Sequence, residues 1–274
     1  MTCFIGIDLG STTTKAVILD ENLKELGHGI TNSRSNYDIA SAVAKQEAIV
    51  NARMKLVEQS LAEFPELSRR LEKILSSLER SFRLEQFMES LADLEMVCRN
   101  NAVGERFKGF EQGMSEALIE TFRKLRIEAP ELFAAGAKRK SDFFRDIAGS
   151  RYLAIGEAVA QEAGLAFDLM LNVYDRSIIE VENRITGENL EEMILSALGR
   201  TLKEFPELSE VSAQVEGAVK DALKIELEET YVVGTGYGRA RLPFSKEHIR
   251  SEILCHGLGA HVMYPNTLTV LDIG

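Results

Sequence analysis

The hydrophobic pattern predicts strands near the start of the chain and a long helical stretch after them. Short apolar or β-branched runs at residues 4–7, 16–19 and 25–30 have the length and composition of strands. Residues 31–103 then hold no glycine, and Pro65 is their only proline. Because glycine and proline are the residues that most disfavour a helix, this stretch is predicted to be helical.

Helical spacing of apolar residues continues through the middle of the chain. It is clear over residues 67–78, 87–94 and 114–125, and residues 151–167 follow the same pattern. We therefore expect residues from about 37 to 205 to be almost wholly helical and to form a separate bundle.

The last quarter of the chain returns to mixed α/β character. The pattern predicts, in order, an amphipathic helix at 211–227, a strand at 231–233, a glycine-rich loop at 234–239, a helix at 245–255 and a buried strand at 268–272. Strands at both ends of a chain with helices between them favour an α/β fold whose sheet is interrupted by an insertion.

A hexapeptide occurs twice. Glu-Phe-Pro-Glu-Leu-Ser stands at residues 63–68 and again at 204–209, and each copy is expected to end one helix and begin another, with its serine as a cap. The flanking residues match poorly. The repeat is therefore either a trace of duplication or one helix-turn-helix solution used twice.

The turn between the first two predicted strands carries the chemistry of a phosphate site. Gly10 permits a tight turn and close approach of a ligand, and the amides and hydroxyls after it can line a concavity for phosphate oxygens. Asp8, at the end of the strand, is suited to a hydrated Mg²⁺, and Lys15 adds a positive charge. The alternative is an ordinary hairpin whose turn is rich in threonine. No Gly-Lys-Ser/Thr opens a helix here, so this is not a Walker loop.

Composition excludes several classes of protein and partner. Of the 274 residues, 45% are hydrophobic and 27% charged, as in ordinary globular proteins, and the net charge of −11 argues against nucleic acid or an anionic membrane as partner. No apolar run reaches the ~18 residues of a membrane span, and no basic segment of a signal peptide precedes the first strand. The three cysteines, Cys3, Cys98 and Cys255, are too few and too scattered for a disulfide framework, so a cytoplasmic location is expected.

The end of the chain, Asp272-Ile273-Gly274, repeats the strand-Asp-apolar-Gly pattern of residues 8–10. Two such strand ends resemble the first and second phosphate motifs of the actin, Hsp70 and sugar-kinase ATPase superfamily. A narrower resemblance, to the ATPase subunits of benzoyl-CoA reductase and to the related activators of 2-hydroxyacyl-CoA dehydratases, lies in five segments: residues 8–15, 31–38, 234–239, 251–260 and 271–274.

The resemblance implies a fold and a division into domains. It implies an α/β, ribonuclease-H-like (actin-like ATPase) lobe made of residues 1–35 and 206–274, interrupted by an all-helical insertion at 36–205. The chain stops inside the second phosphate motif. We therefore expect an N-terminal portion with one lobe only, inactive alone and binding nucleotide weakly.

The resemblance also implies roles for individual residues. Asp8 and Asp272 would act as the catalytic pair, facing each other across Mg²⁺, with ATP as the nucleotide. The β- and γ-phosphates would be held by residues of the two motifs, namely Gly10, Ser11, Thr12, Thr13, Lys15 and Gly274.

The family members are ATP-driven electron donors. Two ATPase subunits share one [4Fe-4S] cluster, take electrons from ferredoxin and pass them to catalytic acyl-CoA reductase subunits. Cys255 aligns with a cluster ligand of the family, in the segment Ser-Glu-Ile-Leu-Cys-His-Gly-Leu-Gly-Ala at 251–260. The alternative is a buried structural cysteine. Cys3 and Cys98 lack this context and are expected to be inert, and His256 is expected to be structural.

Three functional classes therefore stand. The first is an ATP-hydrolysing electron-donor subunit of benzoyl-CoA reductase type. The second is a phosphotransferase of the sugar or acetate kinase superfamily, which has no need of Cys255 and its glycines. The third is a non-catalytic assembly module, which the helical insertion would allow.

Overall fold

A computed structural model describes residues 1–33, 36–139, 141–182, 184 and 189–272. The chain forms two compact units. The sheet unit comprises Met1–Phe64, Ile185–Leu190 and Gly217–Gly274, and the helical unit comprises Pro65–Arg184 and Glu191–Glu216. These units divide the chain at points other than the predicted lobe and insertion, and the division at residues 36 and 205 stays a prediction.

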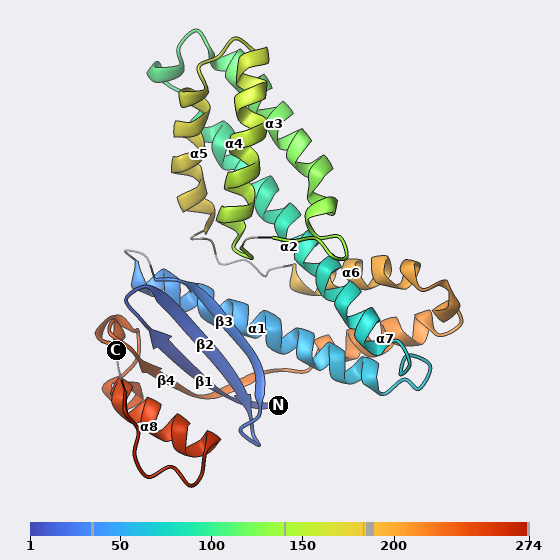
Figure 1. Ribbon diagram of the computed structural model, residues 1–274, viewed down its shortest axis with the longest axis vertical. Helices are drawn as coiled ribbons and strands as arrows, with labels where there is room; N and C mark the ends of the chain where they lie inside the picture. Colours follow the sequence, from blue (N-terminus) through green and yellow to red (C-terminus); the bar gives the residue numbers. More distant parts are fainter. Residues whose placement is uncertain (34–35, 140, 183, 185–188, 273–274) are drawn as a thin grey trace. The chain divides into compact units, whose positions relative to one another are not determined.

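The sheet unit is built on four strands in the order β3-β2-β1-β4 (Figure 1). β1 (Thr2–Leu9), β2 (Thr13–Asp20) and β3 (Glu25–Asn32) are antiparallel neighbours, and β4 (Glu228–Thr235) runs parallel to β1. Buried and partly exposed residues alternate along β1, as expected for a strand with one covered face. The four strands predicted at residues 4–7, 16–19, 25–30 and 231–233 are confirmed, and each is longer than its apolar run.

One helix, α1 (Tyr37–Ala62), covers a face of this sheet. Its buried Ala44, Ala48 and Ala52 lie on one side of the helix and pack with the apolar residues of β1 and β2. They also meet Gly27 and Gly29 of β3 so closely that backbone touches backbone. A Cβ atom on Gly29 would lie 2.1 Å from the Ala44 carbonyl oxygen.

α1 lies within the residue range of the predicted insertion, and it packs on the strands as part of the sheet unit. The reason is its stripe of alanines, which fits a glycine-bearing strand better than a core of large side chains. Asn36 caps the helix, its side chain accepting a hydrogen bond from the Ile39 amide at 3.2 Å.

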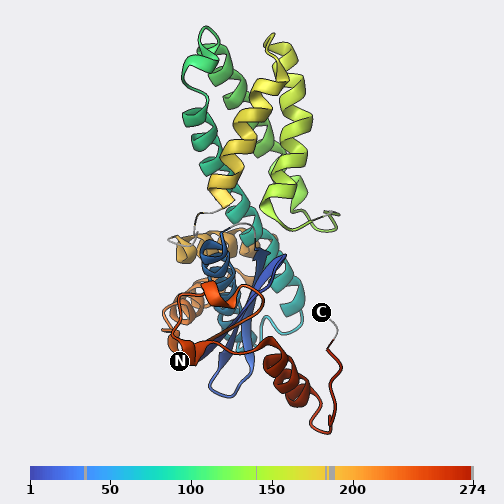
Figure 2. The ribbon, with the colours of Figure 1, turned by 90° about the vertical axis from the view of Figure 1, so that its left-hand side faces the viewer.

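The helical unit is a bundle of α2 (Leu71–Asn101), α3 (Glu111–Leu132), α4 (Phe144–Glu162) and α5 (Phe167–Glu182), which lie side by side in both views (Figures 1 and 2). Aromatic side chains fill its core. The Tyr152 ring stacks on Tyr174 with centroids 4.5 Å apart and lies 5.8 Å from Phe122. The buried Tyr152 hydroxyl donates to the Met170 carbonyl at 3.2 Å, so its polar group is satisfied.

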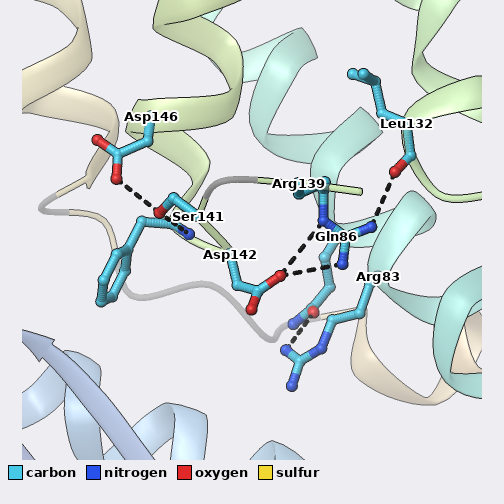
Figure 3. A network of polar contacts seen from close by, with 8 residues as sticks. Arg83, Gln86, Leu132, Arg139, Ser141, Asp142 and Asp146 are labelled. Atoms are coloured by element: carbon cyan, nitrogen blue, oxygen red, sulfur yellow. Dashed lines mark hydrogen bonds and ion pairs between the residues drawn. The ribbon is translucent and has the colours of Figure 1, made fainter. Parts of the chain in front are cut away.

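Arg139 ties down the connection between α3 and α4. Its guanidinium donates to the Leu132 carbonyl, pairs with Asp142 and lies over the Phe133 ring, 4.6 Å from its centroid. Figure 3 shows the contacts of Arg139 with Leu132 and Asp142, together with the Ser141 hydroxyl, which donates to Asp146 in the first turn of α4. Arg139 thus links the end of α3 to Asp142, two residues before α4 begins.

Two further helices follow, α6 (Leu190–Glu204) and α7 (Ser212–Leu223). Both hexapeptide copies join helices as predicted, the second through a 3₁₀ turn at Pro206–Leu208. The predicted serine caps are wrong in both copies. In the second copy, α7 begins at Ser212, three residues after Ser209. The Ser68 hydroxyl donates to the Pro65 carbonyl, and α2 begins three residues later with Arg70 as its N-cap.

The predicted helix at 245–255 is displaced. Residues Lys246–His248 form a 3₁₀ turn, and the helix α8 runs from Glu252 to Met263. The Arg250 amide donates to the Gly234 carbonyl at 2.9 Å, and Ile249 forms a parallel bridge with Gly234. This pairing with the end of β4 extends the backbone and delays the helix.

The predicted buried strand at 268–272 is wrong. These residues have no strand assignment, and Leu268 is 98% exposed. A strand needs a ladder of backbone partners, and no described strand pairs with this segment. Among the helices that the structure describes, none combines the length and the apolar character that a membrane crossing needs.

The contact between α1 and β3 gives a test of this packing. Gly29→Ala should lower the stability of the sheet unit by about 1–3 kcal/mol, because the added methyl group would overlap the Ala44 carbonyl. Thermal unfolding followed by circular dichroism measures the effect. Gly199→Ala is the control, since a Cβ there meets nothing within 4 Å. Equal melting temperatures for the two variants would contradict the packing described here.

Candidate functional site

The candidate site lies where β1 ends and β2 begins. β1 extends to Leu9 and β2 begins at Thr13, so the connection is only residues 10–12, shorter than predicted. A Cβ on Gly10 would lie 2.6 Å from the Thr13 carbonyl oxygen, which explains the glycine. Ser11 and Thr12 are exposed at this turn, where their amides and hydroxyls can reach a ligand.

Asp8 and Lys15 are directly opposed partners in the β1–β2 ladder. Alternation along the strands places both on the face of the sheet opposite to the one that α1 covers. Lys15 Nζ lies 3.7 Å from Asp8 Oδ2, and the lysine side chain is 57% exposed, so the attraction between them is weak.

The other oxygen of Asp8, Oδ1, is buried and has no hydrogen-bond partner. A buried carboxylate oxygen left unpaired is costly unless a cation or water completes it. It stands at the mouth of a turn rich in hydroxyls and next to a lysine. This donor set fits a hydrated divalent cation that bridges to phosphate.

Ser33 braces the turn from behind, a role that sequence reasoning missed. It is fully buried directly after β3, its hydroxyl donates to the Gly10 carbonyl at 2.6 Å, and its amide donates to the Thr12 carbonyl at 2.9 Å. The buried Thr14 hydroxyl lies 2.9 Å from Ser33 Oγ and completes the network. The pairing of Thr13 with Asn32 in the β2–β3 ladder places the next residue, Ser33, beside the turn.

The glycine-rich loop after β4 also reaches this site. The Gly238 amide donates to the Leu9 carbonyl at 2.8 Å, and Thr235 is the partner of Asp8 in the parallel β1–β4 ladder. Arg239 donates to the Gly236 carbonyl at 3.0 Å. The loop is thus bonded to the end of β1 at Leu9 and closed on itself by Arg239.

Cys255 lies on α8, among side chains that are largely exposed, and it is partly buried. The other two thiols differ. Burial raises the pKa of Cys98 to about 12, and burial also raises the pKa of Cys3. Neither buried thiol has the properties of a reactive group or a metal ligand, since both of these roles need the thiolate. The role of Cys255 as a cluster ligand stays a prediction.

The second phosphate motif is only partly described. Asp272 Oδ2 lies 3.0 Å from His256 Nδ1, a neighbour that the sequence did not predict. Its predicted position opposite Asp8 stays a prediction, and Gly274 lies outside the described residues. Within the described ranges, no three His, Cys, Asp or Glu side chains group as metal ligands. The described residues of this chain therefore do not provide a cluster site by themselves.

Comparison with known proteins identifies the family. The model of the BadF/BadG/BcrA/BcrD ATPase family matches residues 5–274. The chain belongs to this family. The resemblance to an ATPase family and the α/β fold class predicted from the sequence are thereby confirmed.

Two curated relatives match short segments. An uncharacterized protein, YjiL, of Escherichia coli (strain K12) is 44% identical over 55 residues, 20% of this chain and 21% of that protein. The (R)-2-hydroxyglutaryl-CoA dehydratase activating ATPase of Acidaminococcus fermentans is 43% identical over 44 residues, 16% of this chain and 17% of that protein. The matches thus span about a fifth of each relative or less. No solved structure matches the chain.

The bracing of the turn by Ser33 can be tested. Ser33→Ala should weaken binding of Mg-ATP by the complete protein and lower its stability by about 1–3 kcal/mol, because the buried Thr14 hydroxyl and the Gly10 carbonyl lose their partner. Calorimetric titration and thermal unfolding measure the two effects. The matched control is Ser41→Ala, which removes a hydroxyl bonded to the Asp38 carbonyl on α1. If both variants bind nucleotide equally well, Ser33 does not shape the turn.

Proposed function

We propose that this chain provides the Mg-ATP site of an ATP-driven electron donor. The observation that carries the nucleotide part is the buried, unpartnered Oδ1 of Asp8 beside a glycine and hydroxyl turn. Membership of an ATPase family supports the same reading. The cation would take the Asp8 carboxylate as a ligand, directly or through water, and Asp272 of the second motif would approach it from the other side.

The phosphates would be held by the turn. Gly10 and Ser11 offer amides, Ser11, Thr12 and Thr13 offer hydroxyls, and Lys15 offers a mobile positive charge. Gly274 would add an amide from the second motif. Bound Mg²⁺ supplies charge neutralisation for phosphoryl transfer. Catalysis of this reaction rests mainly on positioning and electrostatics, so the contribution of the protein is a rigid turn.

The role of Asp8 has a direct test in the complete protein. Asp8→Asn removes the charge and keeps the shape, and it should lower ATPase turnover about 100-fold or more, because a metal contact contributes several kcal/mol. Its melting temperature should not fall, since the altered oxygen makes no hydrogen bond.

The control is Glu21→Gln. Glu21 is an exposed carboxylate on the β2–β3 turn, and its variant should retain full turnover. Unchanged turnover in Asp8→Asn would refute the assignment of Asp8 to the metal.

The electron-donor part of the proposal rests on Cys255 and on the family. Cys255 is partly buried, whereas Cys3 and Cys98 are buried and burial raises the pKa of each of those two thiols. A [4Fe-4S] cluster needs four ligands, normally thiolates, so Cys255 would act with ligands outside the described residues and with those of a second ATPase subunit. A relative named as an activating ATPase of a dehydratase supports this direction.

Partners follow from the same proposal. Ferredoxin would supply electrons, and catalytic acyl-CoA reductase subunits, of the benzoyl-CoA type, would receive them. A cytoplasmic location suits a cluster of this kind. The net charge of −11 supports the absence of nucleic acid and membrane from the list of partners.

The redox reading is tested by iron content. The complete complex, purified without oxygen, should be brown, and Cys255→Ser should lower its iron and abolish ATP-dependent electron transfer while nucleotide binding remains. Cys98→Ala, in the core of the helical unit, is the control and should keep its iron. A wild-type complex without iron would leave a phosphotransferase of the sugar or acetate kinase type as the better function.

A further inference from the structure

The loop after β4 meets the end of β1 through glycines. Gly236 has a φ of +93°, a backbone conformation that residues other than glycine rarely adopt. A Cβ on this residue would lie 2.5 Å from Asp8 Oδ1 and 2.6 Å from the Leu9 carbonyl oxygen. The carboxylate of Asp8 therefore occupies the space that a side chain at position 236 would fill.

No polar contact in the described structure holds this oxygen in place. Asp8 Oδ1 has no hydrogen-bond partner, and Oδ2 faces Lys15 at 3.7 Å, too far for a strong hydrogen bond. The rotamer of the Asp8 side chain is therefore set by van der Waals contact with the surrounding atoms. The backbone of Gly236 is the surface that Oδ1 rests on.

The peptide of Gly236 is itself held firmly. Arg239 donates to its carbonyl at 3.0 Å, and the Gly238 amide fixes the far side of the loop to the Leu9 carbonyl at 2.8 Å. The hydroxyl of Thr235, the residue directly before Gly236, donates a hydrogen bond to the Arg250 carbonyl at 3.1 Å. The loop is thus anchored on both sides of the point where it meets Asp8.

We propose that Gly236 is a positioning residue for Asp8, holding the carboxylate by close backbone contact so that it faces the cation and the phosphates. The role of the contact in catalysis rests on the proposed function, whereas the contact between Gly236 and Asp8 is observed directly. A side chain at position 236 would push the carboxylate aside. Arg239 supports the contact by holding the Gly236 carbonyl.

The first arm of the test is a double-mutant cycle on stability, which needs no activity. Gly236→Ala should lower the melting temperature of the chain less in an Asp8→Ala background than in the wild type, because the clash with the carboxylate is then gone. The strain at φ +93° and the clash with Leu9 are common to both backgrounds, so they cancel.

The matched control for the cycle is Gly238→Ala. A Cβ there would lie 2.9 Å from the side chain of Leu9, and its three nearest atoms all belong to Leu9, so its cost should be the same in both backgrounds. Equal costs of Gly236→Ala in the two backgrounds overturn the proposal. So does failure of Gly236→Ala to fold in both, because the backbone contact with Leu9 would then dominate.

The second arm uses ATP hydrolysis by the complete protein. Gly236→Ala should lower kcat about 100-fold, with little change in KM for ATP and a shift of Mg²⁺ activation to higher concentration, as expected for a misplaced ligand group. Combining it with Asp8→Asn should lower kcat no further than Asp8→Asn alone.

The two arms separate the failure of the inference from the failure of the proposed function. Unchanged turnover in Asp8→Asn refutes the metal role of Asp8, and the stability cycle still reports on the contact. Loss of turnover in Asp8→Asn, together with wild-type kcat in Gly236→Ala, overturns the positioning role alone.

Discussion

The double pairing of β1 is the interaction on which the rest of the sheet unit depends. β1 lies antiparallel to β2 on one side and parallel to β4 on the other. This arrangement brings Asp8 opposite Lys15 in one ladder and opposite Thr235 in the other. A strand at the edge of the sheet would carry the same residues but would leave Asp8 with only one of these neighbours.

Close backbone contact is the second recurring feature. α1 meets β3 at Gly27 and Gly29 with no side chain between them, and the loop after β4 meets Asp8 at Gly236 in the same way. In each place a methyl group would overlap a neighbouring atom. These contacts depend on volume, and they allow very little displacement.

The polar groups of the candidate site divide into supporting and free ones. Ser33 and Thr14 are buried and satisfied by each other and by the turn, so they stabilise its shape. Asp8 Oδ1 is buried and unsatisfied. Ser11, Thr12 and Lys15 face solvent. The turn is held by hydrogen bonds to buried side chains, and it presents solvent-facing groups and an unpaired carboxylate oxygen to a ligand. These properties suit a charged ligand, and they are the physical basis of the proposed nucleotide site.

Local chemistry determined a large part of this structure. The hairpin around Gly10, the strand before Gly234 and the helical middle of the chain follow from residue types and spacing, because turn propensity and helical period act over a few residues. The phosphate turn could be proposed for the same reason, since its donors are consecutive in the sequence.

Tertiary structure alone decided the remaining features. Whether α1 packs on the sheet or with other helices depends on the fit of Ala44 and Ala48 to glycines on β3, and the start of α8 depends on the pairing of Arg250 with Gly234. Ser33 lies 23 residues after Gly10 in the sequence, and Gly236 lies 226 residues after it, yet both reach the site. Helical period and turn propensity carry no information over such separations, because strand register is what brings these residues together.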